Sequence, residues 1–175
     1  GILGYGTIGQ EIAARLTPMK LEIGYSARRN RDVPFSYFPD AKTLAAWCDI
    51  LVVVVPGGKD TNHLVDQKVL TNLGPKGTLI NVARGSVVDE TALIDCLNTG
   101  KLHSAGLDVF QNEPNPNPAL TSLPNVVLYP HHASGTQETR GAMAQLAVDN
   151  LIAHFQNKPL LTPVFSRDQT FRTPQ

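Results

Sequence analysis

The chain opens with GILGYGTIGQ (residues 1–10), in which Gly4, Gly6 and Gly9 give the spacing G-x-G-x-x-G. Apolar residues then recur at helical spacing from Ile8 onward, so the pattern indicates a strand that turns into a helix. In a dinucleotide-binding fold the first glycine permits the tight turn and the second lets the backbone approach a pyrophosphate. The third glycine lets the helix pack close to the strand. Glycines at this spacing also occur in ordinary turns, so the assignment of a dinucleotide-binding turn depends on the sequence that follows.

Length and composition suit one α/β domain, since 175 residues with 42% hydrophobic content can form a real core. Fifteen basic residues balance fifteen acidic ones, so we expect no nucleic-acid partner and no membrane partner. No apolar run reaches the roughly 18 residues of a membrane span, and no signal peptide is visible. Cys48 and Cys96 lie far apart and lack metal-ligand spacing. We therefore expect free thiols, no metal site and a cytoplasmic protein.

Strand and helix patterns alternate along the chain. The run 50–55 is apolar without alternation, which is typical of a strand covered on both faces. Further strands are expected over 21–25, 78–81, 104–109 and 126–129, and helices over 41–48, 66–74, 90–98 and 137–155. Asp40 and Asp89 can cap two of these helices. This alternation predicts a Rossmann-type α/β fold, a doubly wound parallel sheet with helices on both faces.

Four further motifs place polar residues at or near predicted strand ends. They are NVARG (81–85), GLDVF (106–110), NEP (112–114) and PHHASGT (130–136). In this order after the glycine turn, they resemble the D-isomer-specific 2-hydroxyacid dehydrogenases. The similarity covers about residues 1–164 and is strongest to glyoxylate/hydroxypyruvate and hydroxyphenylpyruvate reductases. It implies an NAD(P)-dependent oxidoreductase that reduces a small 2-oxo acid to the 2-hydroxy acid, and a homodimer formed through this domain.

The resemblance also sets an expected domain organisation. Residues 1–158 correspond to the dinucleotide-binding domain, and the Pro- and polar-rich composition of residues 159–175 predicts an irregular C-terminal tail. The family has a second, substrate-binding domain built largely from sequence before the glycine turn. Because only three residues precede Gly4, fewer than the five or six of a typical strand, we expect a fragment that lacks this domain. Such a fragment is expected to be inactive by itself.

The resemblance assigns three catalytic residues. Arg84 would bind the carboxylate of the 2-oxo acid through paired guanidinium donors, although a surface arginine at a helix end is an alternative. His131 would be the general acid that protonates the keto oxygen, because an unperturbed histidine has a pKa of about 6.5. Glu113 would hydrogen-bond the imidazole, orient it and favour its charged form. A histidine after a proline is commonly structural, and sequence spacing alone does not establish this contact.

The cofactor-binding residues are expected at the ends of the strands. The expected set is Gly4, Gly6, Thr7, Ile8, Gly9, Ser26, Arg28, Arg29, Pro56, Ala83, Arg84, Asp108, His131 and Ser134. By resemblance, Asp108 would lie beside the nicotinamide carboxamide, or its carboxylate would satisfy loop amides, and both can hold together. Pro56 begins a segment that would let the backbone approach the cofactor, or it is a simple turn.

The segment YSARR (25–29) indicates which cofactor is preferred. NAD-specific Rossmann domains carry Asp or Glu about 20 residues beyond the glycine turn to bind the ribose 2′-hydroxyl, and no acid occurs here before Asp32. Ser26 can donate to a 2′-phosphate and Arg28 or Arg29 can pair with it, so we expect NADPH to be preferred, with NAD use left open. An arginine pair that merely solvates a surface loop is the alternative interpretation.

Two alternative functions remain open from the sequence. A non-enzymatic, dinucleotide-sensing regulator or corepressor could use the same scaffold, because such relatives can keep the three catalytic residue types. Another Rossmann protein, such as a methyltransferase, is disfavoured by the four later motifs.

Overall fold

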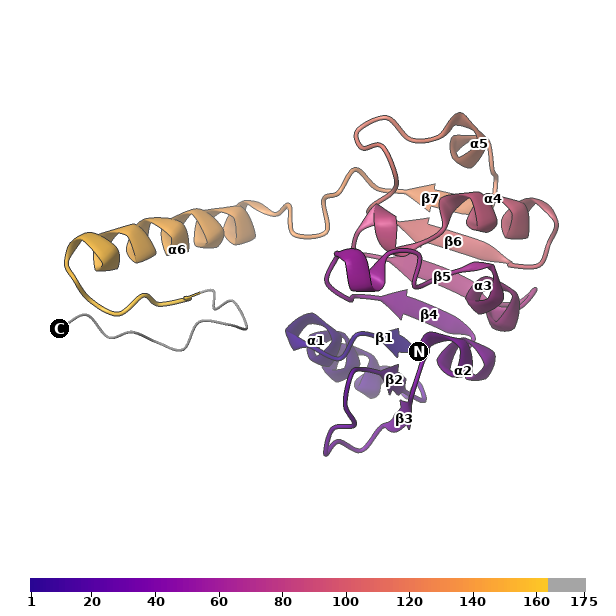
Figure 1. Ribbon diagram of the computed structural model, residues 1–175, viewed down its shortest axis with the longest axis horizontal. Coiled ribbons are helices and arrows are strands. Elements are labelled where there is room, and N and C mark those ends of the chain that lie inside the picture. Colours follow the sequence, from indigo (N-terminus) through magenta and orange to yellow (C-terminus); the bar gives the residue numbers. More distant parts are fainter. Residues whose placement is uncertain (164–175) are drawn as a thin grey trace. The chain divides into compact units, whose positions relative to one another are not determined.

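The computed structural model describes residues 1–163 of the chain. It divides into two compact units, Gly1–Ala133 and a second that begins at Ser134. The first unit holds the sheet (Figure 1). The second contains helix α6 (Gln137–Phe155), whose first turn is capped by the Thr136 hydroxyl. The domain boundary at residue 158 and the tail 159–175 stay predictions, and residues 164–175 lie outside the described part.

One sheet of parallel strands organises the first unit, with the order β3-β2-β1-β4-β5-β6-β7. Its strands are β1 (Ile2–Leu3), β2 (Gly24–Ser26), β3 (Ser36–Phe38), β4 (Ile50–Val53), β5 (Thr78–Asn81), β6 (Ser104–Leu107) and β7 (Val126–Leu128). The order reverses between β1 and β4 (Figure 1), and ligands of open α/β sheets bind outside the strand ends at such a point. The predicted doubly wound sheet is confirmed.

Helices connect the strands, and several of them begin where an acidic residue supplies the N-cap. The helices of the first unit are α1 (Thr7–Leu16), α2 (Ala41–Trp47), α3 (Gln67–Leu73), α4 (Glu90–Asn98) and α5 (Pro118–Thr121), with short 3-10 turns η1 (Thr17–Met19), η2 (Lys59–Thr61) and η3 (Gly85–Val87). Asp40, Asp66 and Asp89 each accept the backbone N–H three residues later. Within residues 1–163 no helix is long and apolar enough to cross a membrane.

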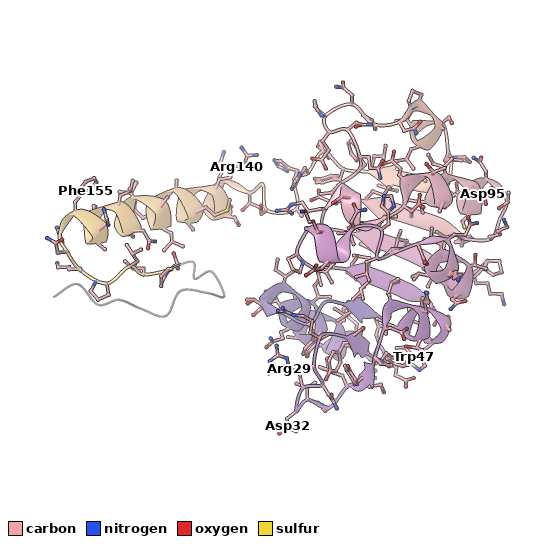
Figure 2. All side chains as sticks on the ribbon, viewed as in Figure 1. Arg29, Asp32, Trp47, Asp95, Arg140 and Phe155 are labelled. Atoms are coloured by element: carbon pink, nitrogen blue, oxygen red, sulfur yellow. The ribbon has the colours of Figure 1, made fainter. Side chains whose placement is uncertain are left out.

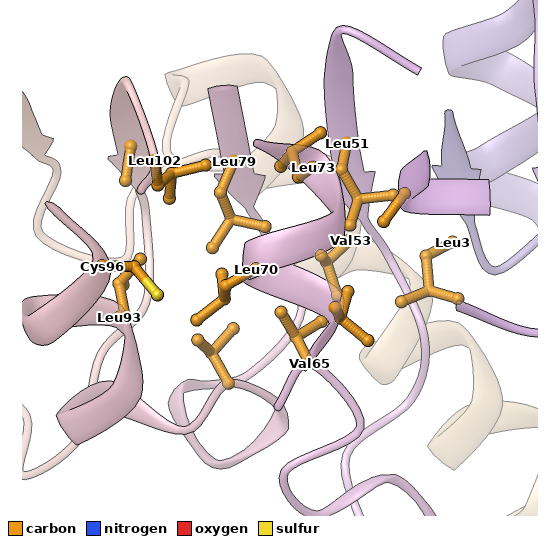
Figure 3. Packing of buried hydrophobic residues seen from close by; sticks show 14 of the residues in the cluster. Leu3, Leu51, Val53, Val65, Leu70, Leu73, Leu79, Leu93, Cys96 and Leu102 are labelled. Atoms are coloured by element: carbon orange, nitrogen blue, oxygen red, sulfur yellow. The ribbon is translucent and has the colours of Figure 1, made fainter. Parts of the chain in front are cut away.

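The hydrophobic core lies on both faces of the sheet. Consecutive strand residues point to opposite faces, and accordingly Ile2 packs in a cluster with Ala13 of α1. Its neighbour Leu3 belongs to the larger cluster under α2, α3 and α4. There Leu70 of α3 and Leu79 of β5 are fully buried (Figure 3). Helices therefore cover both faces, as predicted.

The second strand differs from its prediction. It was expected over 21–25, but Leu21 and Glu22 are exposed and β2 begins only at Gly24. The apolar pattern includes these residues, whereas the strand is set by pairing: Tyr25 lies opposite Ile2 of β1. The ladder therefore runs one residue past the predicted end at residue 25 and includes Ser26, the last residue of β2.

Other differences concern short elements and strand ends. The edge strand β3 and the single-turn helix α5 were not predicted. β4 and β6 end at Val53 and Leu107, before 55 and 109, because both pair with Asn81, the last residue of β5. β7 ends one residue early and α2 ends at Trp47. The predicted bounds of α4, α6 and β5 are confirmed.

Candidate active site

A cleft of about 890 Å³ opens where β1, β4 and β5 end. It is lined by three segments that are far apart in the sequence, and these residues are Gly6, Thr7, Ile8, Val54, Val55, Pro56, Gly57, Gly58, Val82, Ala83, Arg84, Gly85 and Ser86. The three parent strands are neighbours in the sheet (Figure 1). The cleft therefore occupies the switch point, and its volume lies within the range of about 300–1,000 Å³ that is common for cofactor and ligand sites.

The glycine turn presents the amino end of α1 to this cleft. Gly6 is the N-cap and offers no side chain, and the first turn has no acidic residue. The N–H groups of a first helical turn lack partners within the helix, so a phosphate group suits them electrostatically and by hydrogen bonding. A Cβ on Gly6 would meet no atom within 4 Å, whereas a Cβ on buried Gly9 would overlap the Gly4 carbonyl oxygen. This turn fits a dinucleotide pyrophosphate.

Arg84 stands on a turn that Asn81 holds in place. The Asn81 side chain is buried, and its amide donates to the Arg84 carbonyl oxygen at 3.1 Å and accepts from the Ala83 N–H at 3.0 Å. The exposed guanidinium donates to the Ala83 carbonyl oxygen at 2.5 Å and forms no ion pair within the described residues. With five N–H donors in all, it keeps donors available for a carboxylate in the cleft.

His131 and Glu113 are in direct contact. His131 Nδ1 lies 2.7 Å from Glu113 Oε2, and the other carboxylate oxygen accepts the Phe110 N–H at 3.1 Å. The side chains are 48% and 30% exposed respectively. A carboxylate partner makes Nδ1 the donor and orients the ring, which leaves Nε2 as the atom that can exchange a proton with a ligand. The structure thus supplies the contact that sequence spacing could not establish.

Asp108 anchors the loop that carries His131. Its buried carboxylate accepts the N–H groups of His132 and Ala133, at 2.7 and 3.1 Å, and its carbonyl oxygen accepts the His131 N–H at 2.8 Å. The interpretation that Asp108 satisfies loop amides is therefore confirmed. Each carboxylate oxygen has a second lone pair, so the contact with a nicotinamide carboxamide stays a compatible prediction.

The residues expected to select the cofactor lie at the end of β2 and directly after it. The carbonyl oxygen of Ser26 accepts the Gly4 N–H at 2.9 Å, which places the end of β2 beside the glycine turn. Arg28 and Arg29 are exposed and form no ion pair with a described residue (Figure 2 labels Arg29). Ser26 and both arginines lie outside the cleft lining. Ser134 begins the second unit, and its cofactor contact stays a prediction.

Several cleft residues were not among the expected site residues. They are Val54, Val55, Val82, Gly85 and Ser86, whereas Gly57 and Gly58 belong to the segment beginning at Pro56 that was expected to approach the cofactor. Each of them follows the end of β4 or β5, so their position after a buried strand is the signal that could have identified them. Asn81 carries a related signal, because it is a polar residue at the end of an apolar strand.

Comparison with known proteins agrees with this arrangement. Residues 1–133 match the family model of the D-isomer specific 2-hydroxyacid dehydrogenase, NAD binding domain. The chain is 52% identical to 2-ketogluconate reductase of Gluconobacter oxydans and 50% identical to glyoxylate/hydroxypyruvate reductase A of Arabidopsis thaliana. Each match covers 94% of this chain and 53% of the relative.

A solved structure gives the same result. The NADPH-dependent glyoxylate/hydroxypyruvate reductase of Sinorhizobium meliloti, in complex with NADP and malonate, has a TM-score of 0.92 to this chain at 50% identity. The match covers 94% of this chain and 52% of the reductase. The chain thus spans about half the length of these relatives. It belongs to the D-isomer specific 2-hydroxyacid dehydrogenase family.

Proposed function

We propose that this chain is the dinucleotide-binding part of an oxidoreductase that reduces a small 2-oxo acid, of the glyoxylate or hydroxypyruvate type, to the 2-hydroxy acid. The observation that carries the proposal is the 2.7 Å contact between His131 and Glu113 in a member of a dehydrogenase family. The similarity to a 2-ketogluconate reductase adds 2-oxo sugar acids to the substrates that should be tested.

The residues of the cleft fit a nicotinamide dinucleotide. Thr7 and Ile8, in the first turn of α1, would hold the pyrophosphate through backbone N–H groups. Pro56, Ala83 and Arg84 line the same cleft and would contact the remainder of the molecule. When bound, the dinucleotide supplies the hydride for the reduction.

The side chains of this chain would supply the proton and bind the substrate. Arg84 would bind the substrate carboxylate with two parallel N–H donors. His131 would give its Nε2 proton to the keto oxygen while the carbon receives the hydride, which yields the hydroxyl group and a neutral imidazole. Glu113 would hold the ring in orientation and stabilise the positive charge that the imidazole carries before the transfer.

We further propose that NADPH is preferred over NADH. The last residue of β2 and the segment after it offer Ser26, Arg28 and Arg29 and no carboxylate. One charge-assisted contact with a 2′-phosphate contributes about 1.5–3 kcal/mol. This corresponds to a roughly 10- to 150-fold preference before screening by salt. The similar Sinorhizobium meliloti enzyme is described as NADPH-dependent.

The cofactor proposal is tested by measuring kcat/KM of the full-length protein with NADPH and with NADH at fixed ionic strength. We expect Arg28→Ala to lower the preference for NADPH, and Ser26→Asp to lower it further because a carboxylate repels the phosphate. A wild-type preference for NADH, or a preference that neither substitution changes, would contradict the proposal.

The function itself is tested with the full-length protein. NADPH consumption is followed with glyoxylate, hydroxypyruvate and 2-ketogluconate, and we expect turnover of at least one of them. Residues 1–175 alone should bind the dinucleotide but show negligible turnover. Dinucleotide binding by the full-length protein without reduction of any 2-oxo acid would favour the regulator instead. A homodimer and a cytoplasmic location belong to the same proposal, and light scattering tests the former.

A further inference from the structure

A buried carboxylate outside the cleft holds the segment that carries Glu113. Glu90, the first residue of α4, is only 6% exposed, and its Oε2 accepts the backbone N–H of Gln111 at 2.8 Å. Buried carboxylates are uncommon unless they are paired or hydrogen-bonded. Glu90 contributes to neither the cleft lining nor the contact with His131.

A second contact joins the same two segments. A Cβ on Gly85 would overlap the carbonyl oxygen of Phe110, so the backbone that follows Arg84 packs directly against the Phe110 peptide. Only glycine permits this approach. The segment from η3 to the start of α4 therefore contacts residues 110–111 at both of its ends, through Gly85 and through Glu90.

The contacts continue from this point to the imidazole. The Phe110 N–H donates to Glu113 Oε1 at 3.1 Å, and the other oxygen of that carboxylate lies 2.7 Å from His131 Nδ1. Segment 110–116 forms hydrogen bonds within itself and with His131. Among the described residues, its one hydrogen bond to any other part of the chain is that between Gln111 and Glu90. This hydrogen bond therefore links Glu90 to the segment that carries the Glu113 carboxylate.

We propose that Glu90 is a positioning residue for the acid–base pair. It fixes the backbone at Gln111, and through it the place from which Glu113 orients His131. Since Arg84 directly precedes Gly85, the same segment supports the substrate-binding arginine and the catalytic pair together. The inference rests on the proposed function of His131.

The test uses the full-length protein with Glu90→Ala, Glu90→Gln and Glu113→Gln. The glutamine at position 90 keeps a carbonyl oxygen that can accept the Gln111 N–H, so it should restore most of the activity. Asp89→Ala is the matched control, because Asp89 caps the same helix through the Ala92 N–H but does not reach Gln111.

We expect Glu90→Ala to lower kcat roughly 10- to 100-fold, since small displacements of catalytic groups have effects of this size. The dissociation constant of NADPH should change less than about threefold. The pH–rate profile of Glu90→Ala should move in the same direction as that of Glu113→Gln. The midpoint of the His131 titration, which NMR measures without turnover, should move in that direction in both variants. Asp89→Ala should lower thermal stability. Its kcat should stay within about threefold of the wild type, and the titration midpoint of His131 should not shift.

The outcomes separate this inference from the proposed function. If Glu113→Gln moves the titration of His131 but Glu90→Ala moves neither the titration nor kcat, Glu90 has no positioning role. An equal loss in Asp89→Ala would also overturn the inference, because helix stability would then explain it. If His131→Ala and Glu113→Gln leave turnover intact, the proposed function fails instead. Should Glu90→Ala not fold, Glu90→Asp, which is one methylene shorter, gives the same comparison.

Discussion

Removal of the Asp108 carboxylate should release the loop that carries His131. In Asp108→Ala the N–H groups of His132 and Ala133 lose the acceptors that lie 2.7 and 3.1 Å away. Asp108→Asn is the intermediate case, because its amide oxygen can accept one N–H while its NH₂ group faces the other donor. The alanine variant should therefore be the less stable of the two.

The size of the effect follows from these two contacts. A hydrogen bond to a charged group contributes about 1.5–3 kcal/mol, so the pair accounts for about 3–6 kcal/mol. His132 and Ala133 are exposed, so water replaces part of the loss and we expect the lower end. Asp108→Ala should thus lower the free energy of unfolding by about 3 kcal/mol and Asp108→Asn by about 1.5 kcal/mol.

Urea unfolding of residues 1–175, followed by Trp47 fluorescence and circular dichroism, measures the loss. With an m-value of about 2 kcal/mol per M, the midpoint should fall by roughly 1.5 M in Asp108→Ala. The control is Asp95→Ala, which removes an exposed carboxylate bonded to Lys101 and Gln67 and should lower the midpoint by less than about 0.5 M. A midpoint in Asp108→Ala equal to that of the wild type would refute the view that Asp108 anchors the loop.

Three further predictions concern stability and cofactor binding. Burial raises the pKa of the Cys48 and Cys96 thiols. Iodoacetamide at pH 8 should therefore label them only in proportion to the fraction of protein that urea has unfolded. Fast labelling of the native chain would contradict the burial of these two side chains. The backbone N–H of Thr43 lowers the pKa of Asp40 in the folded state. The stability that this cap contributes is therefore present above the unfolded-state pKa of about 3.9, and it is lost as the pH falls through the lower pKa of the folded state. Asp40→Asn should remove that part of the acid dependence between pH 5 and pH 2, and an unchanged dependence would exclude this role. Gly9→Val should lower the free energy of unfolding by about 1–3 kcal/mol through overpacking. It should also weaken dinucleotide binding in calorimetry, because a Cβ at Gly9 overlaps the Gly4 carbonyl oxygen and displaces the glycine turn; unchanged affinity would show that this close packing is not required.

The fold could be predicted where the signal is local. Asp40 and Asp89 mark helix starts because a cap acts within its own turn, and the apolar run after Asp49 indicates a buried strand. The bounds of β2 could not be predicted, because Leu21 suits a strand by composition but the ladder with β1 decides where pairing begins. β3 lies at the sheet edge, and its few residues carry no periodic pattern.

The site could be predicted only in part for the same reason. Parallel strands bring their carboxyl ends to one edge, so the approach of Arg84 to the glycine turn follows from topology. The pairing of His131 with Glu113 came from the family resemblance and is visible only in three dimensions. Glu90 gave no sequence signal, because its partner Gln111 is 21 residues away and the contact depends on the packing of two loops.

The central claim is that His131 supplies the proton for reduction of a 2-oxo acid, and His131→Ala in the full-length protein tests it most directly. NADPH consumption is measured at saturating 2-oxo acid, together with the NADPH dissociation constant and the unfolding midpoint. We predict that turnover falls by about 10²–10⁴-fold while NADPH affinity and stability stay close to wild type. Full turnover by a folded His131→Ala protein would contradict the claim.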